Sequence, residues 1–586
     1  MKQFFKQVFA STIGFIFGAI FLFFIFFFII LGIANSLEEK KADVAESTIL
    51  YFRPESDMVE QGSDNPFDQL DINNLDLKQK EMGLNKTLEA LYAASGDKNI
   101  AGMYLHLPNT FSNGFAVLEE LRAALQNFKD SGKFIVAYSE FYSEAGYYLA
   151  STADKIVLNE AGEMLFNGLH AELMFLKGAL DKVGVEMQVV KYGKYKSAVE
   201  PFIATSMSDE NRLQVKRYLE SILGSYLKQV GKNKAMSPER LREISDKLLI
   251  RQASDAKTLG LVDALGHEQD VFAYIREMLK LEADAKYESL SLSAYYPSRP
   301  FTTDFEAGKI ALVYAEGEIN DGESGMPGKR IVEALREIRK NDDIKAVVMR
   351  INSPGGSALE SDVIYHEMKL TAEKKPLIIS MGNVAASGGY YMAVAGDYIF
   401  AHPATITGSI GVFGLIPNMQ KMFNEKLGIT FDGVATGEYS DLGTVSRPLS
   451  GAEREVIQGM INRTYESFVN KVAKGRKMSF GAVDSIAQGR VWTGEDALKN
   501  GLVDQLGGIK DALAYAAKEV EMEKYRVVEF PKQKNPFEAF MGTKEEVKAD
   551  LLKEELGDLY PLLQLHKDIQ KMKGVQMRLP FTWTIN

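Results

Sequence analysis

The chain has 586 residues, too many for one typical domain, and its 46% hydrophobic and 25% charged residues are ordinary for a globular protein. Its net charge of −11 argues against general nucleic-acid binding, which needs a basic face, and gives no help in adhering to anionic lipid. It contains no cysteine, which excludes disulfides, thiolate catalysis and cysteine-ligated zinc.

The N-terminus predicts a membrane anchor. Residues 13–33, IGFIFGAIFLFFIFFFIILGI, are almost wholly apolar and exceed the roughly 20 residues that cross a bilayer. Lys2 and Lys6 precede this run and Glu38 follows it, so the positive-inside rule leaves the N-terminus cytoplasmic. A cleaved export signal is the alternative, but the run is long for one and no small-residue cleavage site is obvious. We expect residues 1–37 to form a cytoplasmic stub and one uncleaved span of the inner (cytoplasmic) membrane, with the rest periplasmic or otherwise extracytoplasmic.

The rest of the chain contains an internal duplication. AYSEFYSEAGYYLASTADKI at 137–156 resembles SMGNVAASGGYYMAVAGDYI at 380–399. Further along, ASDAKTLGLVDALG at 253–266 resembles GEDALKNGLVDQLG at 494–507. The offset stays near ~240 residues throughout, which indicates the duplication of a whole domain.

Each copy alternates short apolar runs with helix-period stretches. In the second copy the predicted strands are 309–319, 345–351, 376–382 and 397–403, with helices between them that include 328–340 and 358–374. Strands alternating with helices indicate βαβ units, and continuous apolar runs indicate strands covered on both faces. We therefore predict an α/β fold with two tandem repeats, each a parallel β-sheet with flanking helices, preceded by one transmembrane helix.

The repeat and the composition set the predicted boundaries. The expected order is a connecting segment at 38–95, the first repeat at 96–290, a linker at 291–304 rich in Ser, Thr and Pro, the second repeat at 305–530 and a C-terminal extension at 531–586. The extension predicts a charged helix followed by a strand in VQMRLPFTWTIN. The sequence of this extension is compatible with a solvated helix and with a contact to another subunit.

The two copies differ from each other at two positions that carry candidate catalytic residues. Ser387 precedes two glycines at the start of an apparent helix, and Glu144 stands at its place in the first copy. Lys196 lies in the first-copy segment KYGKYKSAVEPF, and its counterpart in the second copy is Ser440. One copy thus keeps a candidate nucleophile and the other a candidate base, which suggests one catalytic site assembled from both halves.

Both residues also have structural explanations. A serine at a helix N-terminus meets free N–H groups that stabilise a developing alkoxide, but an N-cap serine is found at the same place. A free lysine has a pKa of about 10.4 and must be desolvated to act as a base. A surface lysine is the alternative for Lys196, and Lys194 is its competitor for the role of base. The residues that can supply part of an apolar wall are Tyr195, Ala198, Val199 and Phe202.

Two more motifs add to the candidate site. In INSPGGSALES, Gly355 and Gly356 follow a predicted strand and can direct adjacent N–H groups as an oxyanion hole, although a plain Pro-Gly turn has the same sequence. In ITGSIGVFG, Ser409 either hydrogen-bonds a neutral lysine or serves a turn. None of the six histidines belongs to a metal pattern, and His402 is a weak rival as base. We expect no metal and no cofactor.

Five motifs in this order, YKSAVEPF, INSPGGS, MGNVAASGGYY, TGSIGVFG and GLVDQLG, resemble the long, duplicated form of the SppA family of signal peptide peptidases. The resemblance covers nearly the whole chain. It implies a ClpP/crotonase-like fold in both repeats and a membrane-bound serine endopeptidase. Ser387 would be its nucleophile, Lys196 its general base, Gly355 or Gly356 part of its oxyanion hole, and Ser409 an aid to the lysine. It also implies a homotetramer that cleaves apolar peptides such as released signal peptides.

Two other classes of function stay open on the sequence. A crotonase-like enzyme acting on acyl-CoA would share the fold and the paired N–H groups, but it would not be exported to a compartment without CoA and would need no lysine at 196. A non-catalytic membrane scaffold, in which both halves are degenerate, would explain why each copy has lost a residue of the pair. The complementary losses in the two copies argue against the scaffold.

Overall fold

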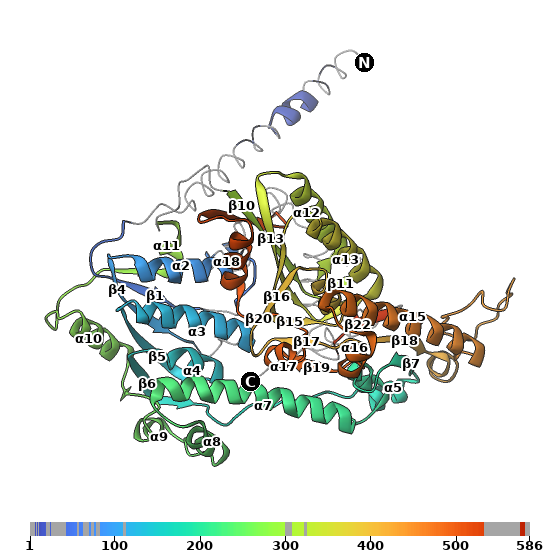
Figure 1. Ribbon diagram of the computed structural model, residues 1–586, viewed down its shortest axis with the longest axis horizontal. Coiled ribbons are helices and arrows are strands. Elements are labelled where there is room, and N and C mark those ends of the chain that lie inside the picture. Colours follow the sequence, from blue (N-terminus) through green and yellow to red (C-terminus); the bar gives the residue numbers. More distant parts are fainter. Residues whose placement is uncertain are drawn as a thin grey trace.

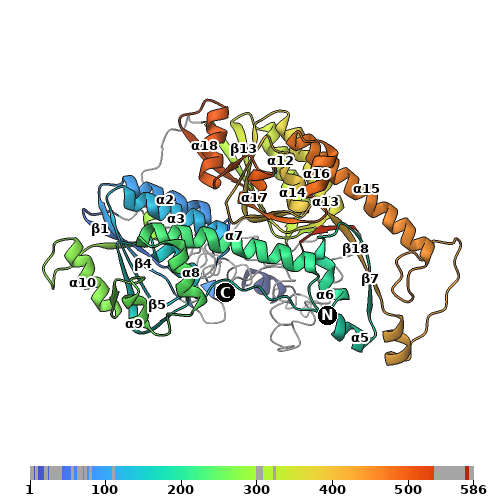
Figure 2. The ribbon, with the colours of Figure 1, turned by 60° about the horizontal axis from the view of Figure 1, so that its bottom comes forward.

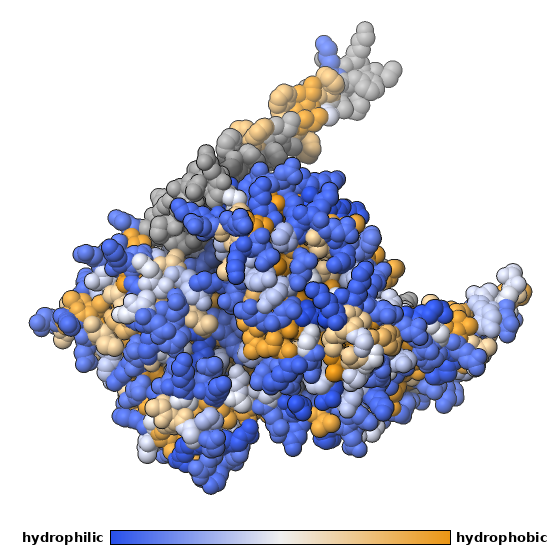
Figure 3. Space-filling view, viewed as in Figure 1, coloured by the Kyte–Doolittle hydropathy of each residue, from blue (hydrophilic) through white to orange (hydrophobic). Residues whose placement is uncertain are grey.

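The structure is a computed structural model (Figure 1), and it describes residues 43–54, 58–62, 70–71, 76–77, 82–108, 113–298, 308–320, 325–532 and 575–579, with residues 6, 9, 11–18, 21 and 24 of the N-terminus. The described members of the predicted anchor are helical and exposed, and the orange surface of this segment in Figure 3 marks their apolar side chains. The other residues of the anchor, and the helix predicted after residue 532, lie outside the described residues. Within the described part of the chain, no helix is long and apolar enough to cross a membrane.

Two parallel sheets with the same strand order form the body of the molecule. The first runs β8 (Ala264–Leu265), β6 (Lys155–Met164), β5 (Phe134–Tyr142), β4 (Ile100–His106), β1 (Thr48–Phe52) and β9 (Ser289–Ser291). The second runs β20 (Gln505–Leu506), β16 (Tyr398–Ala401), β15 (Leu377–Ala386), β13 (Ile344–Ser353), β10 (Gly308–Glu316) and β21 (Tyr525–Phe530), with β17 (Ile406–Gly408) and β19 (Val491–Thr493) following the far end of β15. The predicted α/β fold and duplication are confirmed.

The helices also occur in two sets. The first repeat carries α2 (Leu84–Gly96), α3 (Phe115–Asp130), α4 (Glu144–Ala150), α5 (Lys177–Val183), α6 (Glu200–Ile203), α7 (Asp209–Lys234), α8 (Pro238–Asp246), α9 (Ala253–Thr258), α10 (Glu268–Met278) and α11 (Leu292–Ser298). The second carries α12 (Gly328–Lys340), α13 (Ala358–Ala372), α14 (Gly388–Ala393), α15 (Gly451–Arg476), α16 (Phe480–Ile486), α17 (Gly494–Lys499) and α18 (Ile509–Glu519). The predicted helix 328–340 is α12, whose apolar residues at helical spacing face the core.

Equivalent polar contacts explain the sequence motifs that the repeats share. The carboxylate of Asp154 accepts a hydrogen bond from Ile135 N near the start of β5 (2.9 Å). The carboxylate of Asp397 accepts the equivalent bond from Leu377 N at the start of β15 (2.9 Å). The tyrosines of the GYY motif donate to equivalent carbonyls of the two GLVD segments: Tyr147 to Leu261 O and Tyr390 to Leu502 O, each at 2.8 Å. These buried hydrogen bonds stabilise equivalent positions in the two repeats, which accounts for the motifs that the repeats share.

Two predicted boundaries are wrong. β1 falls in the predicted connecting segment 38–95, yet it pairs with both β4 and β9, so the first sheet includes residues well before 96. The first residues of the predicted linker 291–304 belong to β9 and α11, and the buried Tyr295 of α11 donates to Asp97 Oδ2 (3.0 Å). Short strands and a Ser-rich helix are weak patterns alone, and pairing with the sheet stabilises them. The linker residues after 298 and before 308 lie outside the described residues.

The repeats share a core and a buried ionic cluster. One apolar cluster extends from the first repeat to one face of the second sheet, and Figure 2 shows α7 running alongside both halves. At the junction, Arg350 of β13 is fully buried and pairs with Glu60 (Nε to Oε2, 2.9 Å) and with Glu120 of α3 (Nη2 to Oε1, 2.7 Å). Arg350 also donates to the main chain of β15 at Met381 O (3.2 Å). Because an unpaired buried charge is strongly destabilising, these pairs favour one docking of the repeats.

A third, mixed sheet crosses from one repeat to the other. Its order is β12 (Met326–Pro327), β11 (Ile319–Asn320), β14 (Gly355–Ser357), β22 (Val575–Arg578), β18 (Val412–Asn418) and β7 (Glu186–Tyr192). β7 belongs to the first repeat and pairs antiparallel with β18 of the second along the whole length of both strands, from Val412↔Tyr192 to Asn418↔Glu186. This pairing carries the segment that follows β7 into the second repeat.

Candidate active site

Ser387 lies in a strained turn between β15 and α14. Its φ is 55° and its ψ is −114°, a conformation that costs a non-glycine residue about 1–3 kcal/mol and is found at functional sites. The main chain is fixed on both sides, since Ser387 N donates to Gly408 O and Tyr391 N donates to Ser387 O, each at 2.8 Å. The side chain makes no capping bond to α14. The N-cap explanation therefore fails for the Ser387 hydroxyl.

Lys196 reaches the same place from the first repeat, four residues after the end of β7. Tyr195 N donates to Gln488 O (2.9 Å), which fastens this loop to the second repeat. Gly489 packs against the lysine backbone with a φ of 80°, and a β-carbon there would stand 2.6 Å from Lys196 Cβ. Only glycine fits such a contact without moving the lysine. Neighbouring Lys194 is exposed, which excludes it as the competing base.

The two predicted residues are in hydrogen-bond contact. Lys196 Nζ lies 2.9 Å from Ser387 Oγ, 3.0 Å from Ser409 Oγ and 3.3 Å from Ser409 O. The side chains of all three residues are completely buried. The structure thus brings together, from two repeats, three residues that the sequence singled out.

The surroundings of Lys196 are apolar. The ring centroid of Phe413 lies 6.0 Å from Nζ, and no carboxylate among the described residues forms an ion pair with Lys196. The apolar cluster on this side consists of Val185, Met187, Ala198, Val199, Phe202, Phe413 and Leu415. Burial therefore lowers the pKa of Lys196 well below its ordinary value of 10.5. This shift favours the neutral amine, which is the form that can accept a proton.

The two glycines of the SPGGS motif border the same turn. A β-carbon on Gly355, whose φ is 97°, would lie only 2.7 Å from Gly388 N, the first main-chain amide after Ser387. Both glycines belong to β14 and lie opposite β22, and the N–H of Gly355 donates to Ser353 Oγ (3.2 Å). The predicted glycines are therefore placed beside Ser387, together with the amide of Gly388, which the sequence analysis did not single out.

The equivalent positions of the other copies hold no second site. Glu144 is buried, and its Oε1 accepts from Asn167 N (3.0 Å); burial raises the pKa of this carboxyl. Ser440 is exposed and donates to Gly437 O (2.8 Å) within its own turn. Each copy has thus replaced one member of the pair by a residue that stabilises local structure.

His402, the weak rival as base, belongs to the buried ionic cluster. Its ring lies 3.6 Å from Glu119 Oε2 and 3.4 Å from Glu120 Oε1. Although burial opposes its charge, the carboxylate of Glu120 and then that of Glu119 raise the pKa of His402. A histidine engaged in this way is structural, as expected.

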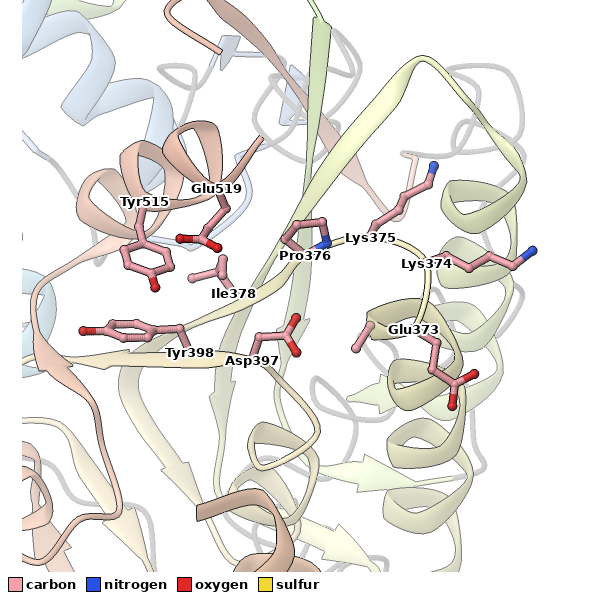
Figure 4. A pocket seen from close by; sticks show the side chains of 10 residues that line it. Glu373, Lys374, Lys375, Pro376, Ile378, Asp397, Tyr398, Tyr515 and Glu519 are labelled. Carbon is pink, nitrogen blue, oxygen red and sulfur yellow. The ribbon is translucent and has the colours of Figure 1, made fainter. Parts of the chain in front are cut away.

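A pocket of about 400 Å³ lies at the opposite end of the second sheet (Figure 4). Pro376 and Ile378 at the start of β15 line it, and the rings of Tyr398 and Tyr515 stack on one wall with centroids 4.3 Å apart. Ser387 follows the carboxyl end of β15. Since parallel sheets bind ligands at the carboxyl ends of their strands, this pocket is separate from the candidate site.

Known proteins match the chain over most of its length. Peptidase family S49 matches twice, at residues 127–282 and 369–523, and the Clp protease family matches residues 312–407. The chain is 37% identical to Protease 4 of Salmonella typhi over 76% of this chain and 74% of that protein. It is 36% identical to Protease 4 of Haemophilus influenzae over 72% of this chain and 71% of that protein. It is 35% identical to the chloroplastic serine protease SPPA of Arabidopsis thaliana over 74% of this chain and 65% of that protein. A ClpP1 mutant from Listeria monocytogenes aligns with 34% of this chain and 94% of its own, at 17% identity and a TM-score of 0.24.

Replacing Lys196 by Met should change how stability depends on pH. Between the lowered pKa of folded Lys196 and 10.5, the unfolded chain binds a proton that the folded protein does not, so this group should raise wild-type stability with pH by up to about 1.4 kcal/mol per unit. Lys196→Met lacks this contribution. We expect the free energy of unfolding of this variant, measured in urea at several pH values, to exceed that of the wild type at pH 7. The difference should disappear by pH 10.

The matched control is Lys194→Met, an exposed lysine two residues away. Its unfolding free energy should run parallel to that of the wild type at every pH. Parallel curves for Lys196→Met as well would show that Lys196 is charged in the folded protein.

Proposed function

The chain belongs to peptidase family S49, and from this premise we propose that it is a serine endopeptidase with a Ser387/Lys196 catalytic dyad. The observation that carries the proposal is the 2.9 Å contact between a strained, buried serine and a buried lysine that has no counter-ion among the described residues. An acyl-CoA enzyme or a scaffold needs neither the strain nor the desolvated amine.

The three oxygen neighbours of Lys196 suit a neutral amine. Such an amine has two N–H donors and one lone pair. With the N–H groups directed at Ser409 Oγ and Ser409 O, the lone pair is left for the hydroxyl of Ser387. Ser409 thereby acts as a positioning residue, and it has a left-handed φ of 49° with its N–H bound to Arg490 O (2.7 Å).

Peptide hydrolysis then follows in two steps, formation of an acyl-enzyme and its hydrolysis. Ser387 Oγ attacks the substrate carbonyl carbon while its proton passes to Lys196 Nζ, and the ammonium returns that proton to the leaving amine as the C–N bond breaks. Water attacks the resulting acyl-enzyme and gives a proton to Lys196. The ester bond to Ser387 Oγ then breaks, Lys196 returns the proton to that oxygen, and the new carboxyl group leaves. The oxyanion of each step would lie against the main-chain amides of the Gly355–Gly356 loop and of Gly388.

The proposed substrates are apolar peptides such as released signal peptides. The apolar cluster beside Lys196 supports this class, because a wall of this kind favours apolar side chains near the reacting bond. The anchor predicted at residues 13–33 would keep the site close to a bilayer in which such peptides lie.

We also propose that the protein forms a head-to-tail homotetramer, and the duplication supports it. By their place in the repeat, residues 168–174 correspond to β18 and residues 430–436 to β7. Gly184 and Gly428 end the equivalent helices α5 and η3 (Met422–Leu427) with left-handed φ. Within the described residues neither segment belongs to a strand. Pairing 430–436 of one copy with 168–174 of the next would repeat the β7–β18 contact between copies, and such a heterologous contact can close into a ring.

Removal of either member of the dyad should abolish peptidase activity. We expect Ser387→Ala and Lys196→Ala each to lower kcat/KM by roughly 10³-fold or more, since nucleophile and base act as a unit, and Ser409→Ala by about 10-fold. Wild-type activity should rise with pH as Lys196 deprotonates and level off below 10.5. Lys194→Ala and Ser440→Ala are matched controls that should keep full activity on a fluorogenic peptide. Full activity of Ser387→Ala would overturn the assignment.

The anchor should determine where the protein is found. We expect the full-length chain to sediment with membranes and resist carbonate extraction, and a variant without residues 1–37 to be extracted. A protease added outside the cytoplasmic membrane should digest the second repeat of the full-length protein. Recovery of a wild-type chain shortened at its N-terminus would instead show a cleaved export signal.

The proposed ring contact depends on exposed apolar residues of 430–436. Phe431→Glu should lower the mass of the full-length protein in detergent from that of a tetramer toward that of a monomer, measured by light scattering. Phe480→Glu changes an exposed phenylalanine on α16 and should leave the mass unchanged. An unchanged mass for Phe431→Glu would exclude this contact.

A further inference from the structure

The loop that carries Lys196 is held by a side-chain amide of α7, the helix that runs alongside both halves in Figure 2. Gln214 of this helix is only 5% exposed. Its Nε2 donates to Ser197 Oγ (2.8 Å) and to Tyr195 O (3.4 Å), on either side of the lysine. Its Oε1 accepts from Val491 N of β19 (3.3 Å). One amide group therefore connects both neighbours of Lys196 to a strand of the second repeat.

The strand that Gln214 contacts follows a turn that also contacts Ser409. In this turn, Gln488 O accepts from Tyr195 N (2.9 Å). Two residues further on, Arg490 O accepts from Ser409 N (2.7 Å). The turn therefore lies between the loop of the lysine and the serine that contacts the lysine amine. Because Gln214 bonds to the first residue after this turn, it fixes the lysine loop against the same support that fixes Ser409.

A buried carboxylate sets the orientation of this amide. Glu200 of the YKSAVEPF motif accepts at Oε2 from Asn211 Nδ2 (2.8 Å), and Asn211 Oδ1 accepts from Gln214 Nε2 (3.1 Å). Since a carboxylate accepts hydrogen bonds and donates none, each amide of this chain has one orientation, in which Gln214 directs its oxygen to Val491 N. A buried network of this kind is rigid when all its members are satisfied. The motif of the lysine thus also carries Ser197 and the carboxylate that orients Gln214.

We propose that Gln214 is a positioning residue for the general base, which keeps Lys196 Nζ within hydrogen-bond reach of Ser387 Oγ and Ser409 Oγ. The inference rests on the proposed Ser387/Lys196 function and adds to it a residue that acts through the loop and not on the reacting atoms. A displacement of about 1 Å in a catalytic group can cost about 10²-fold in rate. A base on a long, flexible side chain therefore needs a fixed main chain.

The position of the loop also determines how well Lys196 is desolvated. Burial lowers the pKa of this lysine, so a loop that moved away from its support would admit water and raise that pKa toward 10.5. Among the described residues, the charged side chains that contact, belong to or directly follow the loop are Lys191, Lys194, Glu200 and Arg490. Gln214→Met changes none of these charges. A shift of the pH profile in this variant would therefore report the burial of the lysine.

Kinetics of Gln214→Met in the full-length protein test the proposal. We expect kcat per active site to fall roughly 10–100-fold on a fluorogenic peptide, with KM within about twofold of the wild type. The midpoint of the rise of kcat/KM with pH should move up by about one unit. Active sites are counted by complete labelling with a fluorophosphonate, so partial unfolding lowers their number without moving the midpoint. A wild-type midpoint would show that Gln214 has a structural role alone, and the proposal would be wrong.

Gln229→Met is the matched control, because it makes the same substitution at a half-buried glutamine later on α7. The main-chain oxygen of Gln229 accepts from Arg122 Nη2 (3.0 Å), and this bond does not depend on the side chain. We expect wild-type kcat and a wild-type midpoint for this variant. A midpoint shift equal to that of Gln214→Met would attribute the effect to α7 in general and reject the proposal.

Ser197→Ala covers the case in which Gln214→Met does not fold. It deletes only the hydroxyl that accepts from Gln214 Nε2, and it should lower kcat about fivefold and move the midpoint in the same direction. The double variant should resemble Gln214→Met alone, since the hydroxyl acts through the amide. If Ser197→Ala keeps the wild-type midpoint, or if the two effects on kcat multiply fully, the proposal is wrong.

These outcomes are separable from failure of the proposed function. Loss of activity in Ser387→Ala together with a wild-type pH profile in Gln214→Met would reject the positioning role and leave the dyad intact. Full activity in Ser387→Ala would reject the dyad itself, and with it the need to position a base.

Discussion

The antiparallel pairing of β7 with β18 is the interaction on which the site depends. Lys196 belongs to a repeat whose own sheet lies elsewhere, and this pairing brings the loop after β7 to the turn at Ser387. Main-chain pairing is suited to this task, because its register is set by hydrogen bonds along seven residues and not by one side chain. The shared core, the Arg350 cluster and α7 hold the two repeats in the orientation that the pairing needs.

Two residues of the candidate site, Ser387 and Lys196, are held in locally unfavourable states. Ser387 is strained by its backbone conformation, and Lys196 is buried away from water, with no counter-ion in the part of the chain that the structure describes. Each is tolerated because the neighbouring main chain is fixed, by Gly408 O for the serine and by Gln488 O for the lysine loop. A serine that relaxed to an ordinary helical N-cap would turn its hydroxyl to α14, and a solvated lysine would be protonated. The same rigidity therefore maintains both the geometry and the basicity of the pair.

The sequence analysis singled out Ser387 and Lys196, which the structure places in contact, from the differences between the two copies, and it predicted most strands and helices from hydrophobic periodicity. α12 matches its predicted range, and the predicted strands of the second copy correspond to β10, β13, β15 and β16. The strands β1 and β9 were missed because they are short, and each is stabilised by pairing, β1 with β4 and β9 with β1. Arg350 and Glu120 were missed for a related reason: a buried ion pair between distant residues has the same sequence pattern as two surface charges. The β7–β18 pairing has no local signature at all, since it joins two repeats.

The asymmetry of the two repeats follows from this cross-pairing. While a single unduplicated domain would need a second copy to supply β7, a duplicated chain can satisfy one such contact internally. Once that happened, only one combination of serine and lysine remained necessary within the chain, and the other positions were free to change. Glu144 now caps a neighbouring main-chain N–H at Asn167 and Ser440 closes a surface turn, which are ordinary structural uses. Loss of one residue from each copy is therefore what an internal β7–β18 contact predicts, whereas loss of both residues from one copy would leave the other dependent on a partner chain.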